Sequence, residues 1–282
     1  MTVRKLDVAV VGAGFSGLYL LHKLRSSGFS VAVFEKADQL GGTWHWNRYP
    51  GARCDIPSLQ YSYQFDEELQ QEWSWSEKYS AQPEILEYLN HVADRFNLRK
   101  DIVFNTEVTS AKFNEDKSLW EIKTSQEKVE ANFCVMATGC LSTPNEPNFQ
   151  GLKDYQGQLL HTGRWPQVPI DFSGEKVAII GTGSSSIQSI PVIAEQAKHL
   201  YVFQRTPNYS IPSNNGPMDI KEEAEVKSRY SEFRKENWEN GFGIAGLEVE
   251  ALAVEADFES KLEKFSHHWK HEGLGFLGAY AD

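Results

Sequence analysis

The chain has 282 residues, of which 40% are hydrophobic and 12% aromatic, so it is far too apolar for a disordered protein and long enough for about two domains. Its 28 Lys and Arg residues against 39 Asp and Glu give a net charge of −11. This balance argues against nucleic acid or an anionic membrane as the main partner, because both select basic surfaces.

The cysteines and the apolar N-terminal stretch indicate a cytoplasmic protein. Cys54, Cys134 and Cys140 form no CxxC pair and no even framework, which is typical of free thiols in a reducing compartment. The stretch from Val8 to Leu21 is too short to span a bilayer, three glycines interrupt it, and no cleavage site follows. We therefore interpret it as the first structural element of the fold.

The first 35 residues predict a βαβ unit. Leu6–Val11 is a continuous apolar run, which is typical of a parallel strand buried on both faces. Apolar residues then recur at every third position over 15–27, a helical stripe that Gly28 ends. A second short run, Val31–Phe34, closes the unit at Glu35.

The pattern then changes twice before residue 140. A helix is expected from Pro83 to Phe96, because proline is tolerated in a first helical turn and apolar residues recur behind it. Short alternating segments over 102–136 predict an antiparallel insertion. We expect its last strand, Phe133–Ala137, to be buried and to run into Thr138-Gly139.

The second half repeats the opening pattern after a linker. Residues 140–175 are rich in Pro and Gly and lack periodicity. A strand, a helix and a second strand are then predicted at Val177–Ile180, Ser185–Ala197 and Leu200–Phe203. The sequence from Asp219 onward is charged and has a helical pattern. A mononucleotide-binding half needs a third parallel strand, which the sequence does not show, so the chain is expected to be incomplete.

The first strand runs directly into a GxGxxG turn, Gly12-Ala13-Gly14-Phe15-Ser16-Gly17, that opens a helix. The first glycine permits the tight bend, the second lets the backbone approach a pyrophosphate, and the third permits close helix–strand packing. Glu35 ends the second strand 18 residues after Gly17, where a carboxylate accepts hydrogen bonds from the hydroxyls of an unphosphorylated adenosine ribose. The alternative is a turn that merely packs tightly.

A second turn, Gly181-Thr182-Gly183-Ser184-Ser185-Ser186, also leaves a strand and opens a helix. Arg205 lies 19 residues after Ser186, and a guanidinium at that corner suits a ribose that carries a 2′-phosphate. Thr206 adds a hydroxyl donor. A solvated arginine at a strand end is the alternative. One acidic corner and one basic corner imply FAD or NAD at the first turn and NADP at the second.

The linker carries a longer motif over 155–166, which reads Tyr-Gln-Gly-Gln-Leu-Leu-His-Thr-Gly-Arg-Trp-Pro. This resembles the fingerprint of the Baeyer–Villiger monooxygenases, FxGxxxHxxxW followed by Pro or Asp. The matching positions are Tyr155 (in place of Phe), Gly157, His161, Trp165 and Pro166. Flavin-containing and N-hydroxylating monooxygenases usually carry Tyr or Phe at the Trp165 position. The resemblance also covers the segments 41–44, 47–55, 137–139 and 202–206.

The resemblance implies that the first unit binds FAD and the second NADPH. It also implies that a ketone and O2 are the small-molecule partners, and that one oxygen atom is inserted next to the carbonyl through a flavin peroxide to give an ester or lactone. An Asp at the position of Asp55 is expected to orient a catalytic arginine in a segment beyond residue 282. The predicted cofactor-binding positions are Gly12, Gly14, Phe15, Gly17, Glu35, Gly42, Thr43, Trp44, Asp55, Tyr61, Val108, Ala137, Thr138, Gly181, Gly183, Ser184, Ser185, Ser186, Arg205 and Thr206.

These patterns predict an α/β fold of two Rossmann-like dinucleotide-binding units, truncated at the C-terminus and ending in a helical segment. An FAD-binding domain is predicted at 1–140, the linker at 141–175, the first part of an NADP-binding domain at 176–218 and the helical segment at 219–282. The chain alone is expected to bind flavin weakly at most and to turn over no ketone.

Several residues keep a second interpretation. Asp55 also fits a turn residue, because Asp often bonds its own backbone in loops rich in Pro and Gly. His161 is either a satisfied structural histidine or a catalytic acid or base. Trp44 and Trp46 either stack near the flavin or pack in the core.

The sequence also bears on a metal site and on other classes of nucleotide-binding protein. His267, His268 and His271 lie at helical spacing, but no carboxylate or cysteine completes a ligand set, so no metal site is predicted. A flavin N- or S-oxygenating monooxygenase is the alternative among enzymes, and a non-catalytic nucleotide-binding fragment is the alternative outside them. A flavoprotein disulfide reductase is disfavoured, because no CxxC or CxxxxC motif lies near the first glycine turn.

Overall fold

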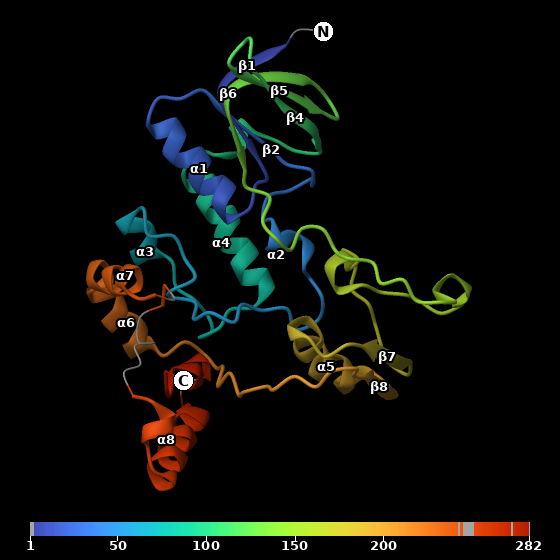
Figure 1. Cartoon of the computed structure of the whole chain (residues 1–282), viewed down its shortest axis with the longest axis vertical. Coiled ribbons are helices and arrows are strands. Elements are labelled where there is room, and N and C mark those ends of the chain that lie inside the picture. Colours follow the sequence, from blue (N-terminus) through green and yellow to red (C-terminus); the bar gives the residue numbers. More distant parts are fainter. Residues whose placement is uncertain (1–2, 242, 245–250, 272, 282) are drawn as a thin grey trace. The chain divides into compact units, whose positions relative to one another are not determined.

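The computed structural model describes residues 3–241, 243–244, 251–271 and 273–281, and the chain divides into two compact units (Figure 1). The first unit comprises Met1–Pro50 and Ile85–Asp171, and the second comprises Gly51–Glu84 and Phe172–Asp282. This division follows packing, and it places residues 51–84 with the second half of the chain. The domain boundaries expected at 140, 175 and 218 stay a prediction.

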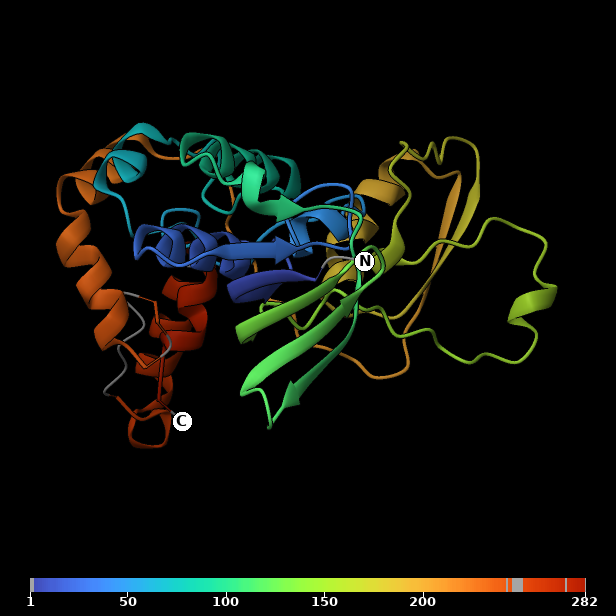
Figure 2. The same ribbon diagram turned by 90° about the horizontal axis from the view of Figure 1, so that it is seen from above.

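A six-stranded sheet forms the centre of the first unit, in the order β3-β2-β1-β6-β5-β4. Its strands are β1 (Arg4–Val11), β2 (Val31–Phe34), β3 (Ile102–Val103), β4 (Val108–Asn114), β5 (Leu119–Thr124) and β6 (Lys128–Met136). The four strands β3, β2, β1 and β6 are parallel, whereas β5 and β4 are antiparallel additions (Figure 2). The α/β class and the first βαβ unit are therefore confirmed.

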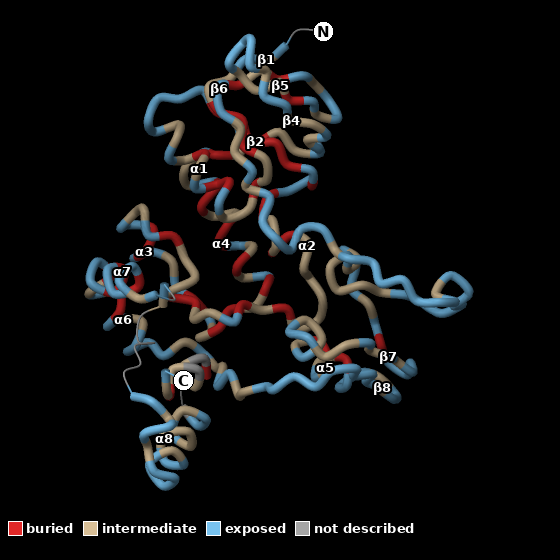
Figure 3. The backbone as a smooth tube through the Cα atoms, in the orientation of Figure 1, coloured by how far each residue is buried: buried red, intermediate tan, exposed pale blue. Residues whose placement is uncertain are grey.

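Two helices of this unit bury their apolar stripes, as their periodicity predicts. In α1 (Phe15–Ser26), Leu18 and Leu21 are buried, and in α4 (Gln82–Arg95) Leu89 is buried in the same way (Figure 3). A short helix, α2 (Thr43–Trp46), lies in the loop that follows β2. A further cluster joins the parallel strands to the antiparallel ones, and its buried members are Ala9, Ala32, Phe34, Ile122, Val129 and Ala131.

Two expectations for the segment 102–136 are wrong. Ile102–Val103 pairs in parallel with β2, so the antiparallel part begins only at Val108. The strand expected at Phe133–Ala137 forms as the end of β6, but the side chains of Phe133 and Met136 are 59% and 55% exposed. The reason is that β5 pairs with β6 only as far as Ala131, so within the described residues the end of β6 has a paired neighbour in β1 alone.

The second unit contains the repeated strand–helix–strand pattern. It forms as β7 (Lys176–Ile180), α5 (Ser184–Gln196) and β8 (His199–Phe203), each within one residue of its expected bounds. The two strands pair in parallel as a two-stranded sheet. After Asp219 the described residues form helices and no strand, as expected. The remaining helices are α3 (Glu67–Glu72), α6 (Ile220–Ser228), α7 (Tyr230–Glu239) and α8 (Phe258–His271).

Two further features of the fold concern its helices and its cysteines. None of the helices in the described ranges has both the length and the apolar character needed to cross a bilayer. Cys54, Cys134 and Cys140 are free thiols, and burial raises the pKa of Cys54 to about 11. A thiol with so high a pKa is a poor nucleophile near neutral pH.

Candidate functional site

The first glycine turn packs as closely as its motif predicts. A Cβ atom added to Gly17 would lie 1.9 Å from the carbonyl oxygen of Gly12, and one added to Gly12 would lie 2.7 Å from the carbonyl oxygen of Ala137. Gly12 also has a φ of +101°, which favours glycine. The N-terminus of α1 is therefore held against the turn, with its first N–H groups lacking partners within the helix.

Glu35 lies beside this turn with its side chain almost fully buried. The residue is 5% exposed, and its Oε2 accepts a hydrogen bond of 2.7 Å from the N–H of Ala13. Its Oε1 accepts a second bond of 2.8 Å from the N–H of Ala37. Because each carboxylate oxygen has two acceptor positions, Glu35 is held in place and still able to accept ribose hydroxyls.

The other predicted flavin positions of this unit lie around the same strand ends. The N–H of Gly41 donates to the carbonyl of Ala13 over 3.0 Å, so the loop that carries Gly42, Thr43 and Trp44 is fixed to the glycine turn. Trp44 is buried at the start of α2, and Trp46 is half-buried with its ring edge-on to the buried His45.

Three more of these positions follow or begin strands of the sheet. The N–H of Ala137 donates to the carbonyl of Val11 over 2.9 Å, and Thr138 follows it on the surface. Val108 is the first residue of β4. The ring of Phe15 packs 6.4 Å from that of Tyr88 in α4, so only the backbone of Phe15 is suited to a phosphate.

His45, which is 3% exposed in α2, is not among the site residues that the sequence predicts. Burial and then the charge of Arg48 lower the pKa of His45, although Asp38, 3.6 Å away, and Glu35 raise it. A neutral imidazole therefore lies next to the predicted flavin residues Thr43 and Trp44. Nothing in the sequence pattern distinguishes it from a core histidine.

The second glycine turn also leaves a strand and opens a helix. The N–H of Gly181 donates to the carbonyl of Phe203 over 2.8 Å. Gly183 is the N-cap residue of α5, so no capping side chain covers the start of the helix. Ser184 is exposed and Ser185 and Ser186 are half-buried in the first turn of the helix. A helix N-terminus of this kind attracts a phosphate group.

Arg205 and Thr206 lie on the surface just beyond β8. The side chain of Gln204 donates to Thr182 Oγ1 over 2.9 Å, which brings this corner next to the second glycine turn. Arg205 makes no hydrogen bond or ion pair to another residue of the described part of the chain. The acidic corner at Glu35 is thus buried and held by backbone donors, whereas the basic corner is exposed and available to an anion.

Asp55 and Tyr61 belong to the second unit, in the segment 51–84. Asp55 is exposed, and its Oδ1 accepts a hydrogen bond of 3.0 Å from Gln188 Nε2 of α5. Tyr61 is half-buried, with its N–H donating to the carbonyl of Pro57 over 3.0 Å. Gln188 is not among the site residues that the sequence predicts, because no spacing rule connects it to Asp55.

A half-buried ion pair supports the Asp55 loop from the other side. Arg53 Nη1 lies 2.7 Å from Glu77 Oε2, and Asn215 donates to the same oxygen over 2.5 Å. Burial, the largest single effect, raises the pKa of Glu77, but the hydrogen bonds from Arg53 and Asn215 and the charge of Arg53 outweigh it and lower that pKa below its ordinary value of 4.5. Glu77 is therefore ionised throughout the neutral range.

This depressed pKa predicts a pH dependence. The stabilisation from Glu77 is fully present above pH 4.5, and it is lost as the pH falls from there through the lower pKa of the folded state. Glu77→Gln is therefore expected to lower the melting temperature near neutral pH, with a difference from wild type that shrinks in acid. Thermal scans across this pH range measure it, with Glu195→Gln on the exposed side of α5 as the control. A difference that grows in acid would contradict the assignment.

The residues of the linker fingerprint lie in irregular structure of the first unit. His161 Nδ1 accepts a hydrogen bond of 3.1 Å from the N–H of Gly163, and its Nε2 donates to the carbonyl of Asn145 over 3.2 Å. Both ring nitrogens thus serve the local fold, which favours the structural interpretation of His161. Tyr155 is exposed with its ring over Gly157, and Trp165 and Pro166 are half-buried.

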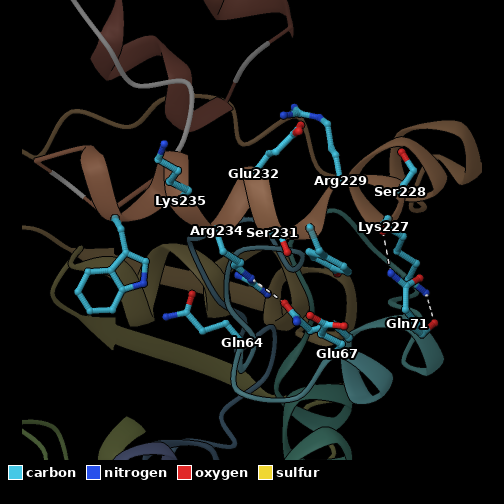
Figure 4. A pocket seen from close by; sticks show the side chains of 13 residues that line it. Gln64, Glu67, Gln71, Lys227, Ser228, Arg229, Ser231, Glu232, Arg234 and Lys235 are labelled. Atoms are coloured by element: carbon cyan, nitrogen blue, oxygen red, sulfur yellow. Dashed lines mark hydrogen bonds between the residues drawn. The ribbon is translucent and has the colours of Figure 1, made fainter.

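A cavity of about 690 Å³ lies elsewhere in the second unit, between α3 and α7 (Figure 4). Arg234 lines it and is 8% exposed, with its guanidinium donating to Gln70 Oε1 and Ser62 Oγ over 3.1 and 2.7 Å. None of the cofactor positions predicted from the sequence lines this cavity. His271 lies outside the described side chains, and the described residues contain no cluster of His, Cys, Asp and Glu that could hold a metal ion.

Comparisons with known proteins place these observations in a family. Residues 9–244 match the family model described as pyridine nucleotide-disulphide oxidoreductase. The chain is 46% identical over 235 residues to an acetone monooxygenase (methyl acetate-forming) of Gordonia sp. (strain TY-5), a match that covers 83% of this chain and 44% of that protein. It is 43% identical over 282 residues to a Baeyer–Villiger monooxygenase of Pseudooceanicola batsensis, which covers 98% of this chain and 51% of that protein.

A solved structure agrees with these sequence matches. An oxidized steroid monooxygenase bound to NADP superposes with a TM-score of 0.94 at 51% identity, over 99% of this chain and 53% of that one. The chain thus spans about half the length of the relatives it matches. The chain belongs to the pyridine nucleotide-disulphide oxidoreductase family and, within it, to the group of the Baeyer–Villiger monooxygenases.

Proposed function

We propose that this chain is the nucleotide-binding part of an FAD- and NADPH-dependent Baeyer–Villiger monooxygenase. In that reaction a ketone, O2, NADPH and a proton give an ester or lactone, NADP+ and water, so one oxygen atom enters the product and the other leaves as water. The contrast between a buried acidic corner at Glu35 and an exposed basic corner at Arg205, one at each glycine turn, carries the proposal.

The first unit fits FAD. The closely packed turn at Gly12–Gly17 presents backbone N–H groups to a pyrophosphate, and Glu35 presents acceptors to a ribose without a phosphate. Gly42, Thr43, Trp44, Val108, Ala137 and Thr138 complete the proposed flavin set. When bound, FAD supplies the redox chemistry that activates O2, and NADPH supplies the reducing equivalents.

The second unit fits NADPH. The N-terminus of α5, with Ser184–Ser186, is placed to bind the pyrophosphate, and Arg205 and Thr206 are placed to bind the 2′-phosphate. Asp55 presents an exposed carboxylate near the same helix, which suits the orienting of a guanidinium. The small-molecule partners proposed are a ketone and O2, and the proposed location is the cytoplasm.

The test joins this chain to the part of the Pseudooceanicola batsensis relative that follows the aligned region, giving what we call the fused enzyme. We expect it to oxidise NADPH in the presence of O2 and a simple cyclic or acyclic ketone, with ester or lactone detected by gas chromatography. Oxidation of an amine or thioether in place of the ketone would point to N- or S-oxygenation. Nucleotide binding without any oxygenated product would point to a non-catalytic role.

A further inference from the structure

The side-chain amide of Gln188, in α5, uses three hydrogen-bonding positions on one short loop. Its Nε2 donates to Asp55 Oδ1 over 3.0 Å and to the carbonyl oxygen of Arg53 over 3.2 Å. Its Oε1 accepts from the N–H of Arg53 over 3.3 Å. Because a primary amide has two N–H groups, both donors and the acceptor are assigned, and the amide has one orientation only.

The backbone of Arg53 faces Gln188 because of its pairing on the opposite side. Arg53 forms an antiparallel bridge with Ala81, flanked by bonds from Cys54 N–H to Ser80 over 3.1 Å and from Gln82 N–H to Ala52 over 2.8 Å. Arg53 and Ala81 are therefore a non-hydrogen-bonded pair, in which the N–H and C=O of Arg53 point away from the segment that contains Ala81. The amide of Gln188 takes the place that a further strand would occupy.

Direct contact with the helix backbone reinforces this arrangement. A Cβ atom added to Gly51 would lie 2.2 Å from the carbonyl oxygen of Gln188, and Gly51 has a φ of +79°. The loop that carries Asp55 therefore lies directly on α5, one turn beyond the Ser184–Ser186 start of the helix. The helix that begins at the second glycine turn thus also fixes the Asp55 loop.

We infer that Gln188 is a positioning residue for Asp55, and this inference rests on the function proposed above. Gln188 engages Oδ1 and, among the described residues, none bonds Oδ2, so the carboxylate is turned to offer Oδ2 to a cation. The same helix presents its N-terminus to the proposed NADPH site. Gln188 therefore ties the direction of the Asp55 carboxylate to the helix that holds the coenzyme.

The activity test uses kinetics of the fused enzyme with Gln188→Met, which keeps the length of the side chain and removes all three bonds. We expect kcat to fall about tenfold or more, the scale of a hydrogen bond to a charged group, while KM for NADPH changes less than about threefold. Glu195→Gln, on the exposed side of the same helix, is expected to leave both constants unchanged.

The same substitution in an Asp55→Ala enzyme distinguishes a positioning role of Gln188 from a general loss of structure. If Gln188 acts through Asp55, then Gln188→Met has little further effect on kcat in an Asp55→Ala enzyme, because the carboxylate it orients is already absent. An equal loss of kcat in both backgrounds, or no loss in either, overturns the inference. If the fused enzyme is inactive even without a substitution, that result counts against the proposed function.

A measurement on the 282-residue chain is independent of activity. Gln188→Met is expected to speed hydrogen exchange at the Arg53 amide about tenfold, since its acceptor is lost, while the Cys54 amide, which donates to Ser80, changes little. Wild-type exchange at Arg53 in this variant would show that Gln188 does not hold the loop, and would overturn the inference even if the fused enzyme is inactive.

Discussion

Replacing Arg205 with alanine is expected to weaken the binding of NADP+ to this chain by about 10- to 100-fold and that of NAD+ by less than about threefold. A charge-assisted bond from a guanidinium to a phosphate is worth about 1.5–3 kcal/mol, and only NADP+ carries the 2′-phosphate. Because Arg205 is exposed, salt screens the contact, so the loss is expected to shrink at high ionic strength.

Calorimetric titration with both coenzymes measures this difference. Arg205→Lys keeps the charge without the planar pair of donors and is expected to fall between wild type and the alanine variant. Arg229→Ala provides the matched control, because that arginine pairs with Glu236 in α7 and not with a predicted nucleotide position. Equal losses for the two coenzymes in Arg205→Ala would remove this residue from the phosphate site.

A methyl group on Gly17 is expected to abolish most FAD binding and to destabilise the first unit by about 1–3 kcal/mol. The added atom would lie 1.9 Å from the backbone oxygen of Gly12, which is far inside contact distance, so α1 must move away from the turn. Movement of the helix withdraws the N–H groups that the pyrophosphate needs.

Quenching of flavin fluorescence and thermal unfolding together measure the effect of Gly17→Ala. Gly28→Ala serves as the control. Gly28 lies just after the C-terminal end of α1, has a φ of +87° and has open space around the position of an added Cβ atom. We expect the control to lose some stability through its backbone conformation but to keep its flavin affinity. Wild-type FAD affinity in Gly17→Ala would contradict the proposed cradle.

Local patterns were enough to predict both glycine turns and the elements around them. The strands that precede Gly12 and Gly181 and the helices that follow them depend on nearest neighbours in sequence, namely an apolar run, a glycine bend and a helical stripe. The same patterns failed for the exposure of Phe133, because burial depends on whether a neighbouring strand continues beside it. Periodicity carries no information on how far β5 extends along β6.

The surroundings of Asp55 could not be predicted for a related reason. Gln188 lies 133 residues from Asp55 and Asn215 lies 138 residues from Glu77, so the contacts exist only once the segment 51–84 packs with the second half of the chain. A boundary drawn along the sequence treats that segment as part of the first domain. Its packing is set by contacts such as those of the Gln188 side chain with the backbone of Arg53 and with Asp55, and these leave no pattern in either segment alone.

The pairing of β1 with β6 has a consequence for the order in which the chain acquires its structure. Arg4 lies beside Val129 and Val11 beside Met136, so the middle of the parallel sheet cannot close until residue 136 has left the ribosome. Contacts so distant in sequence slow folding and leave apolar strands exposed while synthesis continues. During translation β1 therefore keeps the edge that binds β6 unpaired until that strand has been made, and an unpaired strand edge of this kind favours aggregation.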